Sequence, residues 1–292
     1  MIRVLVEGGT VMGQMRQRMT EELRLRGYSE RTVESYVDQV KRFAKHYMRP
    51  PEELGAEEIR AYLLHMTVEE ELAFGTVNQA IYALRFFYTE LLGRPWTEKF
   101  RCQRVKKQKL RTVLSEAEVV RLLGAIVNRK HHAMVMTLYA AGLRLGELLA
   151  VRLNDLDTES MRLRVVAAKG GRERYVMLSE RLLRVLRRYI EQYQPVSLLF
   201  FGLDRQRGLE PSSVQRVVKA AAQRAGIDKP VSPHVLRHSF ATHLMERGTN
   251  VVYIQELLGH KDIQTTLGYV RVCRRSATSV ASPLEWLELD IT

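Results

Sequence analysis

Cysteine and long apolar runs are scarce in this 292-residue chain. Its two cysteines, Cys102 and Cys273, are too few for a disulfide framework, so we expect a reducing compartment, the cytoplasm. No apolar stretch reaches the roughly 18–20 residues that a membrane-spanning helix needs. The apolar run at residues 1–6 is too short for a secretory signal peptide. We therefore expect a soluble intracellular protein.

Acidic residues are also in deficit. The chain has 33 Asp and Glu against 46 Lys and Arg, which leaves a formal net charge of +13. Hydrophobic residues make up 46% of the chain, too many for a disordered polycation and enough for a folded core. Surplus positive charge on a folded protein favours a polyanionic partner, with nucleic acid as the first candidate. Charge alone does not decide this, because basic proteins also have other functions.

The N-terminal third has the pattern of a small helical domain. Residues 1–14 lack periodicity, and we expect a poorly ordered extension there. Apolar residues then recur every three or four positions, and turn residues divide the pattern into helices at residues 15–26, 30–49, 57–66 and 76–92. Gly27 ends the first helix and Ser29 caps the second. Short connections between four helices predict a compact bundle over residues 15–98.

A basic connector follows, which we place at residues 99–112. Its six cations are Arg101, Arg104, Lys106, Lys107, Lys109 and Arg111, with no acid among residues 101–111. One interpretation is a solvated linker. The other is a segment that lies along a DNA backbone, where each neutralised phosphate releases counterions. The position between two helical domains of a basic protein favours the second interpretation.

Residues 113–292 form the second predicted domain, which is mainly α-helical with one small β-hairpin. Ser115 and Glu118 form a capping box at its first helix. Apolar residues on both sides of a Lys-Gly-Gly turn predict the hairpin over residues 161–178. Further helices are expected at residues 130–141, 145–152, 180–193, 211–225, 233–247, 250–258 and 262–270. A mixed C-terminal tail comes after them.

The helix over residues 233–247 concentrates reactive side chains. It opens with a Ser-Pro pair, an N-cap followed by a residue suited to the first helical position. His234, Arg237 and His238 share one face, which we expect to be free of the core and, in the first turns, suited to an anion. The opposite face is apolar and carries His243, which we interpret as a hydrogen-bonded core histidine.

The four-residue spacing of His234 and His238 is also that of a zinc-binding helix. The glutamate of the zinc-protease motif is absent, no cysteine is near in sequence, and Arg237 between the two histidines would repel a dication. We therefore predict no metal site.

Four other positions carry phosphate or proton chemistry, and each alone is a weak signal. A glycine turn places Arg144 at a helix start with Glu147 one helical turn away, and by itself this pair fits an exposed ion pair. Lys169 lies at the hairpin tip. His260 follows a Leu-Gly pair at a helix end, and Tyr269 closes the next helix.

Together these elements resemble the tyrosine recombinases, in their phage-integrase and Xer branch. They occur in that family's order: Gly-Leu-Arg144-x-Gly-Glu147-Leu, Lys169 in a hairpin, His234-x-x-Arg237-His238, Leu-Gly-His260 and Tyr269. The resemblance runs from residue 15 to residue 272 and is highly specific, because five elements match in order. It implies an N-terminal four-helix core-binding (SAM-like) domain and a C-terminal catalytic domain that together clamp duplex DNA.

The resemblance implies DNA strand exchange through a 3′-phosphotyrosine intermediate, without a metal, another cofactor or ATP. Tyr269 would be the nucleophile, and Lys169 the general acid that protonates the leaving 5′-oxygen. Supporting roles would fall to Glu147, which would orient an arginine or the lysine, and to His238.

The resemblance also implies which residues hold the reacting phosphate. Arg144 and Arg237 would stabilise the charge that develops on its non-bridging oxygens, because both guanidinium groups are permanently protonated forked donors. His260 would donate a further hydrogen bond. His234 would act as a general acid, a general base or a phosphate ligand.

Strand exchange of this kind needs four protomers on two DNA sites, with or without a partner recombinase. Leu284, Trp286 and Leu287 in the tail would pack on a neighbouring protomer or on their own domain. After Tyr269, Val-Arg-Val replaces the family's frequent polar-His-Val sequence. The chain therefore fits a mobile-element recombinase at least as well as a chromosome-dimer resolution enzyme.

Three other functions compete with this one, and one of them, a metal-dependent nuclease, has no acidic cluster in the sequence to support it. A catalytically idle DNA-binding protein of the same fold is disfavoured because the tyrosine and both arginines are present. A type IB topoisomerase-like relaxing enzyme shares this chemistry, but the Xer-like N-terminal domain argues against it.

Replacing the six connector cations by Gln should flatten the salt dependence of DNA binding. Each lost phosphate contact should reduce the slope of log K against log salt by about 0.9. Titration of duplex DNA at several salt concentrations measures the slope, and an unchanged slope would identify the connector as a solvated linker.

Overall fold

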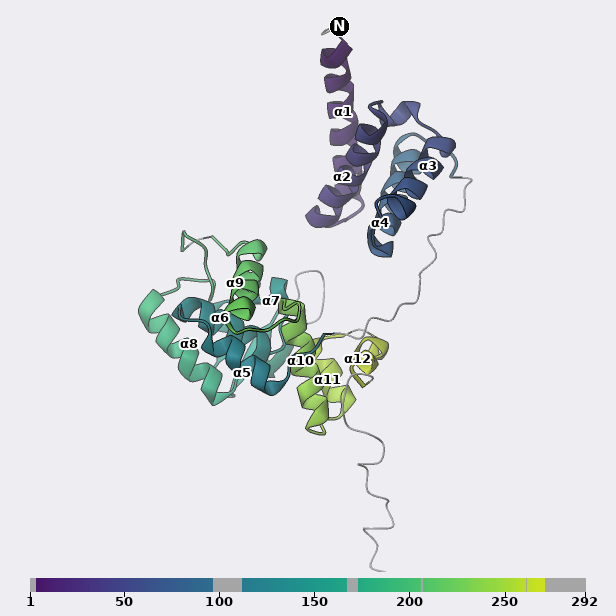
Figure 1. Cartoon of the computed structure of the whole chain (residues 1–292). Coiled ribbons are helices and arrows are strands. Elements are labelled where there is room, and N and C mark those ends of the chain that lie inside the picture. The colour runs from purple at the N-terminus through teal and green to yellow at the C-terminus, as the bar shows by residue number, and fades with distance from the viewer. Residues whose placement is uncertain (1–3, 97–111, 167–172, 206, 261, 271–292) are drawn as a thin grey trace, which may run out of the picture. The chain divides into compact units, whose positions relative to one another are not determined.

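The computed structural model describes residues 4–96, 112–166, 173–205, 207–260 and 262–270. The chain divides into two compact units, Met1–Gln108 and Lys109–Thr292 (Figure 1). The division falls inside the connector predicted at residues 99–112, and the six connector cations themselves lie outside the described residues.

The N-terminal unit is a bundle of four α-helices with two short helical turns between or after them. Its elements are α1 (Val4–Leu25), α2 (Glu30–Tyr47), the 3-10 turn η1 (Pro51–Glu53), α3 (Ala56–Val68), α4 (Phe74–Phe86) and the π-helical turn η2 (Phe87–Leu91). Ser29 caps α2 as predicted, since its Oγ accepts from the Thr32 backbone N–H over 3.3 Å. Helix α1 begins at Val4 instead of Met15, and no proline in residues 4–14 prevents this.

The core of this unit lies between α2, α3, α4 and the end of α1. Its fully buried side chains include Met19, Leu23, Phe43, Met66 and Phe87. The Tyr88 hydroxyl donates to the Pro51 carbonyl over 2.6 Å and ties η2 to η1.

The C-terminal unit surrounds a small sheet with helices. Its helices are α5 (Glu116–Gly124), α6 (Arg129–Ala140), α7 (Leu145–Ala150), α8 (Glu180–Tyr193), α9 (Pro211–Arg224), α10 (Pro233–Glu246), α11 (Val251–Leu258) and α12 (Ile263–Val270), with a 3-10 turn η3 (Leu153–Asp155) after α7. The predicted Ser115–Glu118 capping box is present at α5. These helices match the expected positions to within a few residues.

The predicted hairpin is confirmed as part of a three-stranded antiparallel sheet. Strands β2 (Arg162–Val165) and β3 (Arg174–Met177) pair with Leu163 opposite Val176. A third strand, β1 (Leu156–Asp157), pairs with β2 and was not predicted, because two residues are too short to show an alternating pattern. The hairpin tip, which holds Lys169, lies outside the described residues.

Helix α10 has other helices packed on several of its sides. It packs against α6, α9, α11 and α12. The predicted division into a free polar face and a buried apolar face is therefore wrong. Arg237 is buried together with Leu236 and Ala241, since neighbouring helices cover α10 on several sides.

Gly142 lies within the turn between α6 and α7 and allows α10 to pack against this turn. Its φ is +59°, a conformation that L side chains rarely adopt. A Cβ atom built on Gly142 would lie 2.4 Å from the Phe240 ring. The glycine therefore satisfies two requirements at once, the left-handed turn before Arg144 and close contact with α10.

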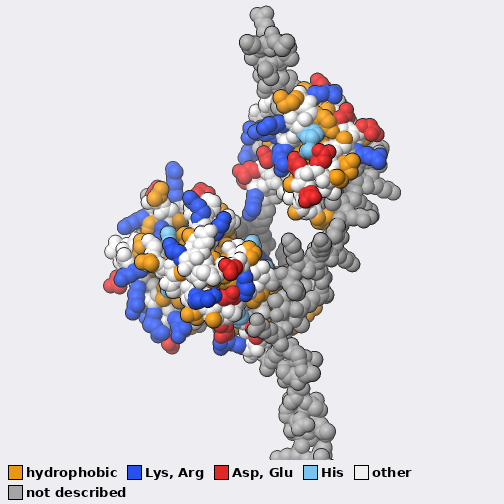
Figure 2. Space-filling model, viewed as in Figure 1, with side chains coloured by type: hydrophobic (Ala, Val, Ile, Leu, Met, Phe, Trp, Pro, Cys, Tyr) orange, Lys and Arg blue, Asp and Glu red, His pale blue; other side chains and the backbone are white. Residues whose placement is uncertain are grey.

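The surface of the C-terminal unit is rich in cations. Figure 2 shows Lys and Arg side chains gathered on its lower left, where Figure 1 places α8. The exposed arginines of α8 are Arg181, Arg184, Arg187 and Arg188. Among the described helices, none combines the length and apolar character needed to cross a membrane.

Replacing Gly142 by Ala should lower the free energy of unfolding by about 2–4 kcal/mol, because the methyl group is strained at this φ and overlaps the Phe240 ring. Urea unfolding followed by circular dichroism measures the loss. Gly146→Ala in α7 is the matched control, because a Cβ there meets open space and alanine favours a helix by about 0.5–1 kcal/mol. Equal effects of the two substitutions would contradict the steric role of Gly142.

Candidate active site

The start of α7 presents Arg144 and Glu147 as one unit. Arg144 is the N-cap residue, and its backbone N–H donates to Glu147 Oε2 over 2.8 Å while its Nη1 donates to Oε1 over 2.8 Å. The side chain of Glu147 is only 4% exposed, whereas that of Arg144 is 41% exposed. The two residues therefore do not form a fully exposed ion pair, because the carboxylate of Glu147 is buried. The contact fits the predicted role of Glu147 in orienting an arginine, which stays a prediction.

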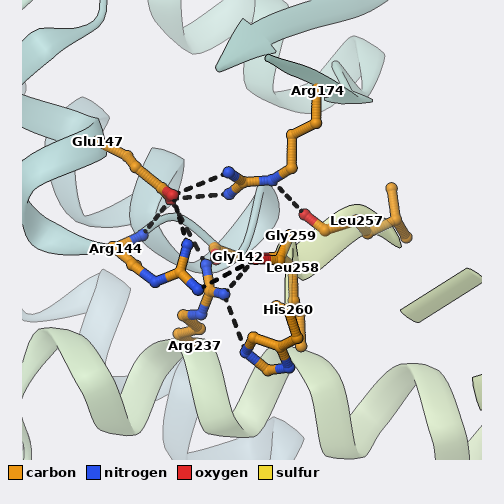
Figure 3. A network of polar contacts seen from close by, with 9 residues as sticks. All are labelled: Gly142, Arg144, Glu147, Arg174, Arg237, Leu257, Leu258, Gly259 and His260. Carbon is orange, nitrogen blue, oxygen red and sulfur yellow. Dashed lines mark hydrogen bonds and ion pairs between the residues drawn. The ribbon is translucent and has the colours of Figure 1, made fainter. Parts of the chain in front are cut away.

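Two more arginines converge on the Glu147 carboxylate (Figure 3). Arg174 reaches it from β3 with a forked pair of hydrogen bonds, Nη1 to Oε1 over 2.8 Å and Nη2 to Oε2 over 2.7 Å. Nη1 of Arg237 on α10 lies 3.5 Å from Oε2. Three guanidinium groups from three elements therefore share one buried negative charge, which leaves two positive charges in excess.

Arg237 is held by carbonyl groups as well as by Glu147. Its Nη1 donates to the Gly142 carbonyl over 2.7 Å, and its Nη2 donates to the Leu258 carbonyl. Nη2 also lies 3.2 Å from Nε2 of His260, just beyond the end of α11. The turn before α7 and the turn after α11 thus supply the acceptors that a buried guanidinium requires.

His260 joins the arginine cluster to α12. Its Nδ1 lies 2.8 Å from the buried Thr266 hydroxyl on α12. Because Arg237 can only donate, Nε2 of His260 is the acceptor in that contact and Nδ1 carries the proton. The His260 ring stacks on that of Tyr269, with centroids 6.3 Å apart and planes 12° apart.

Tyr269 is buried in this structure. Its side chain is 1% exposed and packs with Phe240, Ile254 and Leu258. The phenol oxygen lies 3.0 Å from Nδ1 of His238 on α10. The predicted supporting residue His238 is therefore the hydrogen-bond partner of the predicted nucleophile.

The shifted pKa values of Glu147 and Arg237 leave both groups ionised at neutral pH. Burial raises the pKa of Glu147, but the hydrogen bonds from Arg174 and from the Arg144 backbone outweigh burial and lower the pKa from 4.5 to about 2. Burial and the charge of Arg144 lower the pKa of Arg237 to about 10. At neutral pH Glu147 is therefore an anion and Arg237 a cation.

The other predicted residues lie apart from this cluster or outside the described residues. His234 is exposed in the first turn of α10 and remains a predicted acid, base or ligand. His243 is confirmed as a core histidine, with Nδ1 2.8 Å from the Tyr139 hydroxyl and Nε2 2.8 Å from the Leu114 carbonyl. Lys169 lies outside the described residues, so its role as general acid stays a prediction.

Arg174 was missed by the sequence reasoning, although a signal for it exists. Arg174 precedes Val176 by two residues in β3, and Val176 points into the core. Residues two apart in a strand lie on the same face. A charged residue at an inward position of a strand requires a buried partner, and the nearest helix start offers Glu147.

The cluster has the chemistry of an anion site. Arg144 keeps an exposed guanidinium, and Arg237 and His260 lie beside it with polar atoms within hydrogen-bond distance of each other. A tetrahedral oxyanion suits such a set, because forked guanidinium donors match phosphate oxygens. Within the described ranges, no three His, Cys, Asp or Glu side chains are placed to share a metal ion.

Glu147→Gln should lower the free energy of unfolding by about 3 kcal/mol at neutral pH, because buried Arg174 and Arg237 lose their counter-charge. The contribution of Glu147 is fully present above its ordinary pKa of 4.5 and is lost as the pH falls toward about 2. Urea unfolding midpoints of the variant and the unchanged protein should therefore converge below pH 4.5.

Glu116→Gln is the control for that measurement. Glu116 pairs with Arg247 on the surface, where both side chains are more than half exposed, so the midpoint should hardly change. A Glu147→Gln protein as stable as the control would show that the buried carboxylate does not hold the cluster together.

Comparison with known protein families covers both units. Residues 112–275 match the sequence profile of the phage integrase family, and residues 15–98 match the profile of the phage integrase N-terminal SAM-like domain. The second match has the boundaries predicted for the N-terminal domain. The C-terminal match contains every described residue of the cluster.

Individual relatives and structures agree with the profiles. The chain is 41% identical over 278 residues to a candidate integrase/recombinase of Sinorhizobium fredii, covering 95% of this chain and 90% of that protein. It is 30% identical to the tyrosine recombinase XerA of Pyrococcus furiosus, covering 96% of each. Its fold resembles that of the XerH recombinase bound to its difH DNA, with a TM-score of 0.70, 19% identity, and coverage of 89% and 81%. The chain therefore belongs to the phage integrase family of tyrosine recombinases.

Proposed function

We propose that this protein is a site-specific recombinase that cuts and rejoins DNA strands through a covalent bond between Tyr269 and a 3′-phosphate. One observation carries the proposal most directly. Nη2 of Arg237 lies 3.2 Å from Nε2 of His260, Nη2 of Arg144 lies 3.4 Å from the neighbouring Gly259 carbonyl, and the ring of Tyr269 stacks on His260. This arrangement supports a phosphate-binding role for the cluster and a nucleophilic role for Tyr269.

Arg144, Arg237 and His260 would bind the scissile phosphate. Attack on a phosphodiester adds negative charge to its non-bridging oxygens, and preorganised cations stabilise that charge most. Arg144 and Arg237 are held in place by Glu147 and by backbone carbonyls before any substrate arrives. Donation from His260 requires a proton on Nε2, which the nearby phosphate anion would favour.

Strand cleavage would proceed by in-line displacement. The phenol oxygen of Tyr269 forms a bond to phosphorus, and the bond from phosphorus to the 5′-oxygen breaks. The phenol proton passes to a base, for which His238 and His234 are candidates, and Lys169 gives a proton to the leaving 5′-oxygen. The 3′-phosphotyrosine keeps the bond energy, so a 5′-hydroxyl from another strand can reverse the step without ATP. The arginine charges make a metal ion unnecessary in this scheme.

The burial of Tyr269 indicates a resting state. A side chain that is 1% exposed cannot contact a DNA phosphate, and the hydrogen bond to His238 holds it in place. We infer that α12 moves when DNA binds, and that this movement exposes both the phenol and the guanidinium of Arg237, whose side chain is only 4% exposed. Such a step would limit cleavage to the assembled complex and protect free DNA from random cuts.

Duplex DNA is the substrate that this scheme requires, in the cytoplasm. Four protomers would assemble on two sites, as copies of this chain or with a partner recombinase. Related proteins of solved structure include the XerH recombinase bound to difH substrate and a lambda integrase dimer bound to a core site. Both support DNA as the partner here.

Tyr269→Phe should abolish formation of the covalent adduct while leaving DNA affinity within about threefold, because only the nucleophilic oxygen is removed. The substrate is a nicked suicide duplex that carries a binding site selected from random DNA by the unchanged protein. SDS-resistant protein–DNA complexes on a gel measure the adduct.

A matched control is Tyr139→Phe, because the Tyr139 hydroxyl contacts His243 away from the cluster. This variant should still form the adduct. An adduct in the Tyr269→Phe protein would refute the assignment of the nucleophile, and cleavage that EDTA abolishes and Mg²⁺ restores would favour a nuclease. Relaxation of supercoiled DNA without recombinant products would favour the topoisomerase alternative.

A further inference from the structure

Arg174 is a buried arginine whose hydrogen bonds all go to the protein. Its side chain is 10% exposed. Nη1 and Nη2 donate to the two oxygens of Glu147 over 2.8 and 2.7 Å, and Nε donates to the Leu257 carbonyl over 2.8 Å (Figure 3). Since all three nitrogens have protein acceptors, this guanidinium is occupied in holding the site and is poorly placed to bind a phosphate itself.

The two acceptors belong to the two segments that present the phosphate-binding groups. Glu147 holds Arg144 at the start of α7. Leu257 lies in the last turn of α11, and from there the chain turns through Leu258 and Gly259 to His260. Arg174, from β3, is thus a bridge between these segments.

Close packing also joins Arg174 to the segment that leads to His260. Gly259 has a φ of +61°, and a Cβ built on it would lie 3.1 to 3.3 Å from Cδ, Nη1 and Nε of Arg174. The backbone of the turn therefore lies directly against the guanidinium. His260 follows Gly259 immediately, so the position of its ring depends on this contact.

The charge of Arg174 also stabilises the Glu147 carboxylate. Without Arg174, the Glu147 carboxylate would have only Arg144 and Arg237 as counter-charges and would draw them toward itself. The forked pair with Arg174 satisfies both carboxylate oxygens, and Nη1 of Arg237 lies 3.5 Å from the nearer one. Arg144 contacts Oε1 through Nη1, yet its side chain stays 41% exposed, so the rest of its guanidinium is open to a substrate anion.

We propose that Arg174 is a positioning residue for strand cleavage, which sets Glu147 and the Leu257–His260 turn so that Arg144, Arg237 and His260 meet one phosphate. This inference rests on the proposed function. A misplacement of about 1 Å in such a site costs on the order of 100-fold in rate. Loss of Arg174 should therefore slow cleavage much more than it weakens DNA binding.

The test uses the full-length protein and the nicked suicide duplex. Single-turnover adduct formation and DNA affinity are measured for Arg174→Ala and Arg174→Lys. Arg174→Ala should cleave about 10–100-fold more slowly with DNA affinity within about threefold. Arg174→Lys should also be slow, because an ammonium group cannot serve both carboxylate oxygens and the Leu257 carbonyl in this fork geometry.

Chemical rescue separates positioning from a general loss of stability. Millimolar methylguanidinium should restore at least a tenth of the lost rate to Arg174→Ala, because the free ion can occupy the vacated site. Arg164→Ala is the matched control, since Arg164 lies on the adjacent strand β2 and pairs with a different buried carboxylate, Asp155. Its cleavage rate should stay within about threefold and should not respond to methylguanidinium.

Several outcomes would overturn the inference. Arg174→Lys cleaving as fast as the unchanged protein would show that the forked contact is unnecessary, and this variant decides the question if Arg174→Ala does not fold. Equal losses in Arg164→Ala and Arg174→Ala without rescue would assign the effect to hairpin stability. If the unchanged protein forms no adduct at all, the proposed function fails first and this inference fails with it.

Discussion

A single buried carboxylate organises the catalytic half of this protein. Glu147 is 4% exposed and accepts from Arg144, Arg174 and Arg237, which come from the start of α7, from β3 and from α10. Burying a lone carboxylate would cost desolvation free energy, and so would burying guanidinium groups without a counter-charge. Pairing offsets this cost for both kinds of group. These ion pairs therefore hold the start of α7, β3 and α10 together. Because three guanidinium groups share one carboxylate, the cluster keeps a net positive charge.

The same interaction keeps the charges of the cluster fixed. The carboxylate remains ionised because its pKa is about 2, and Arg237 remains a cation because its pKa is about 10. Fixed charges aimed at a future oxyanion need no reorganisation during the reaction, which is the main source of electrostatic catalysis. Tyr269, the proposed nucleophile, is buried on α12 against His238, and Arg237 is buried as well. The arginine cluster is thus ordered, but both Arg237 and Tyr269 have to become exposed before either contacts a phosphate.

Much of the fold was predictable because its signals are local. Ser29, Ser115 and Ser232 cap the helices that follow them, as expected. A cap depends on a few adjacent residues, and an apolar stripe depends on one helix, so neither requires knowledge of the rest of the chain. Strand β1 and the early start of α1 escaped prediction because two residues show no alternation and a weakly patterned helix shows no clear start.

In the candidate site, too, local signals were predictable and burial was not. The residues of the recombinase motifs were assigned from their order in the chain, but Arg174 was missed, and the face of α10 that carries Arg237 was expected to be free. Both failures concern burial, which depends on which elements pack over a residue. Helices α6, α9, α11 and α12 surround α10, and no pattern within α10 reveals that.

By itself the sequence determined the helices, the hairpin, the two-domain order and the family, because these follow from local propensity and from motifs at fixed spacing. Tertiary structure alone decided that Glu147 is buried, that Arg174 completes its charge, and that Tyr269 rests against His238. These are contacts between residues 27 to 90 positions apart for the carboxylate and 31 apart for the tyrosine. Burial and electrostatic pairing at such separations arise only when the elements pack, so only the folded chain contains them.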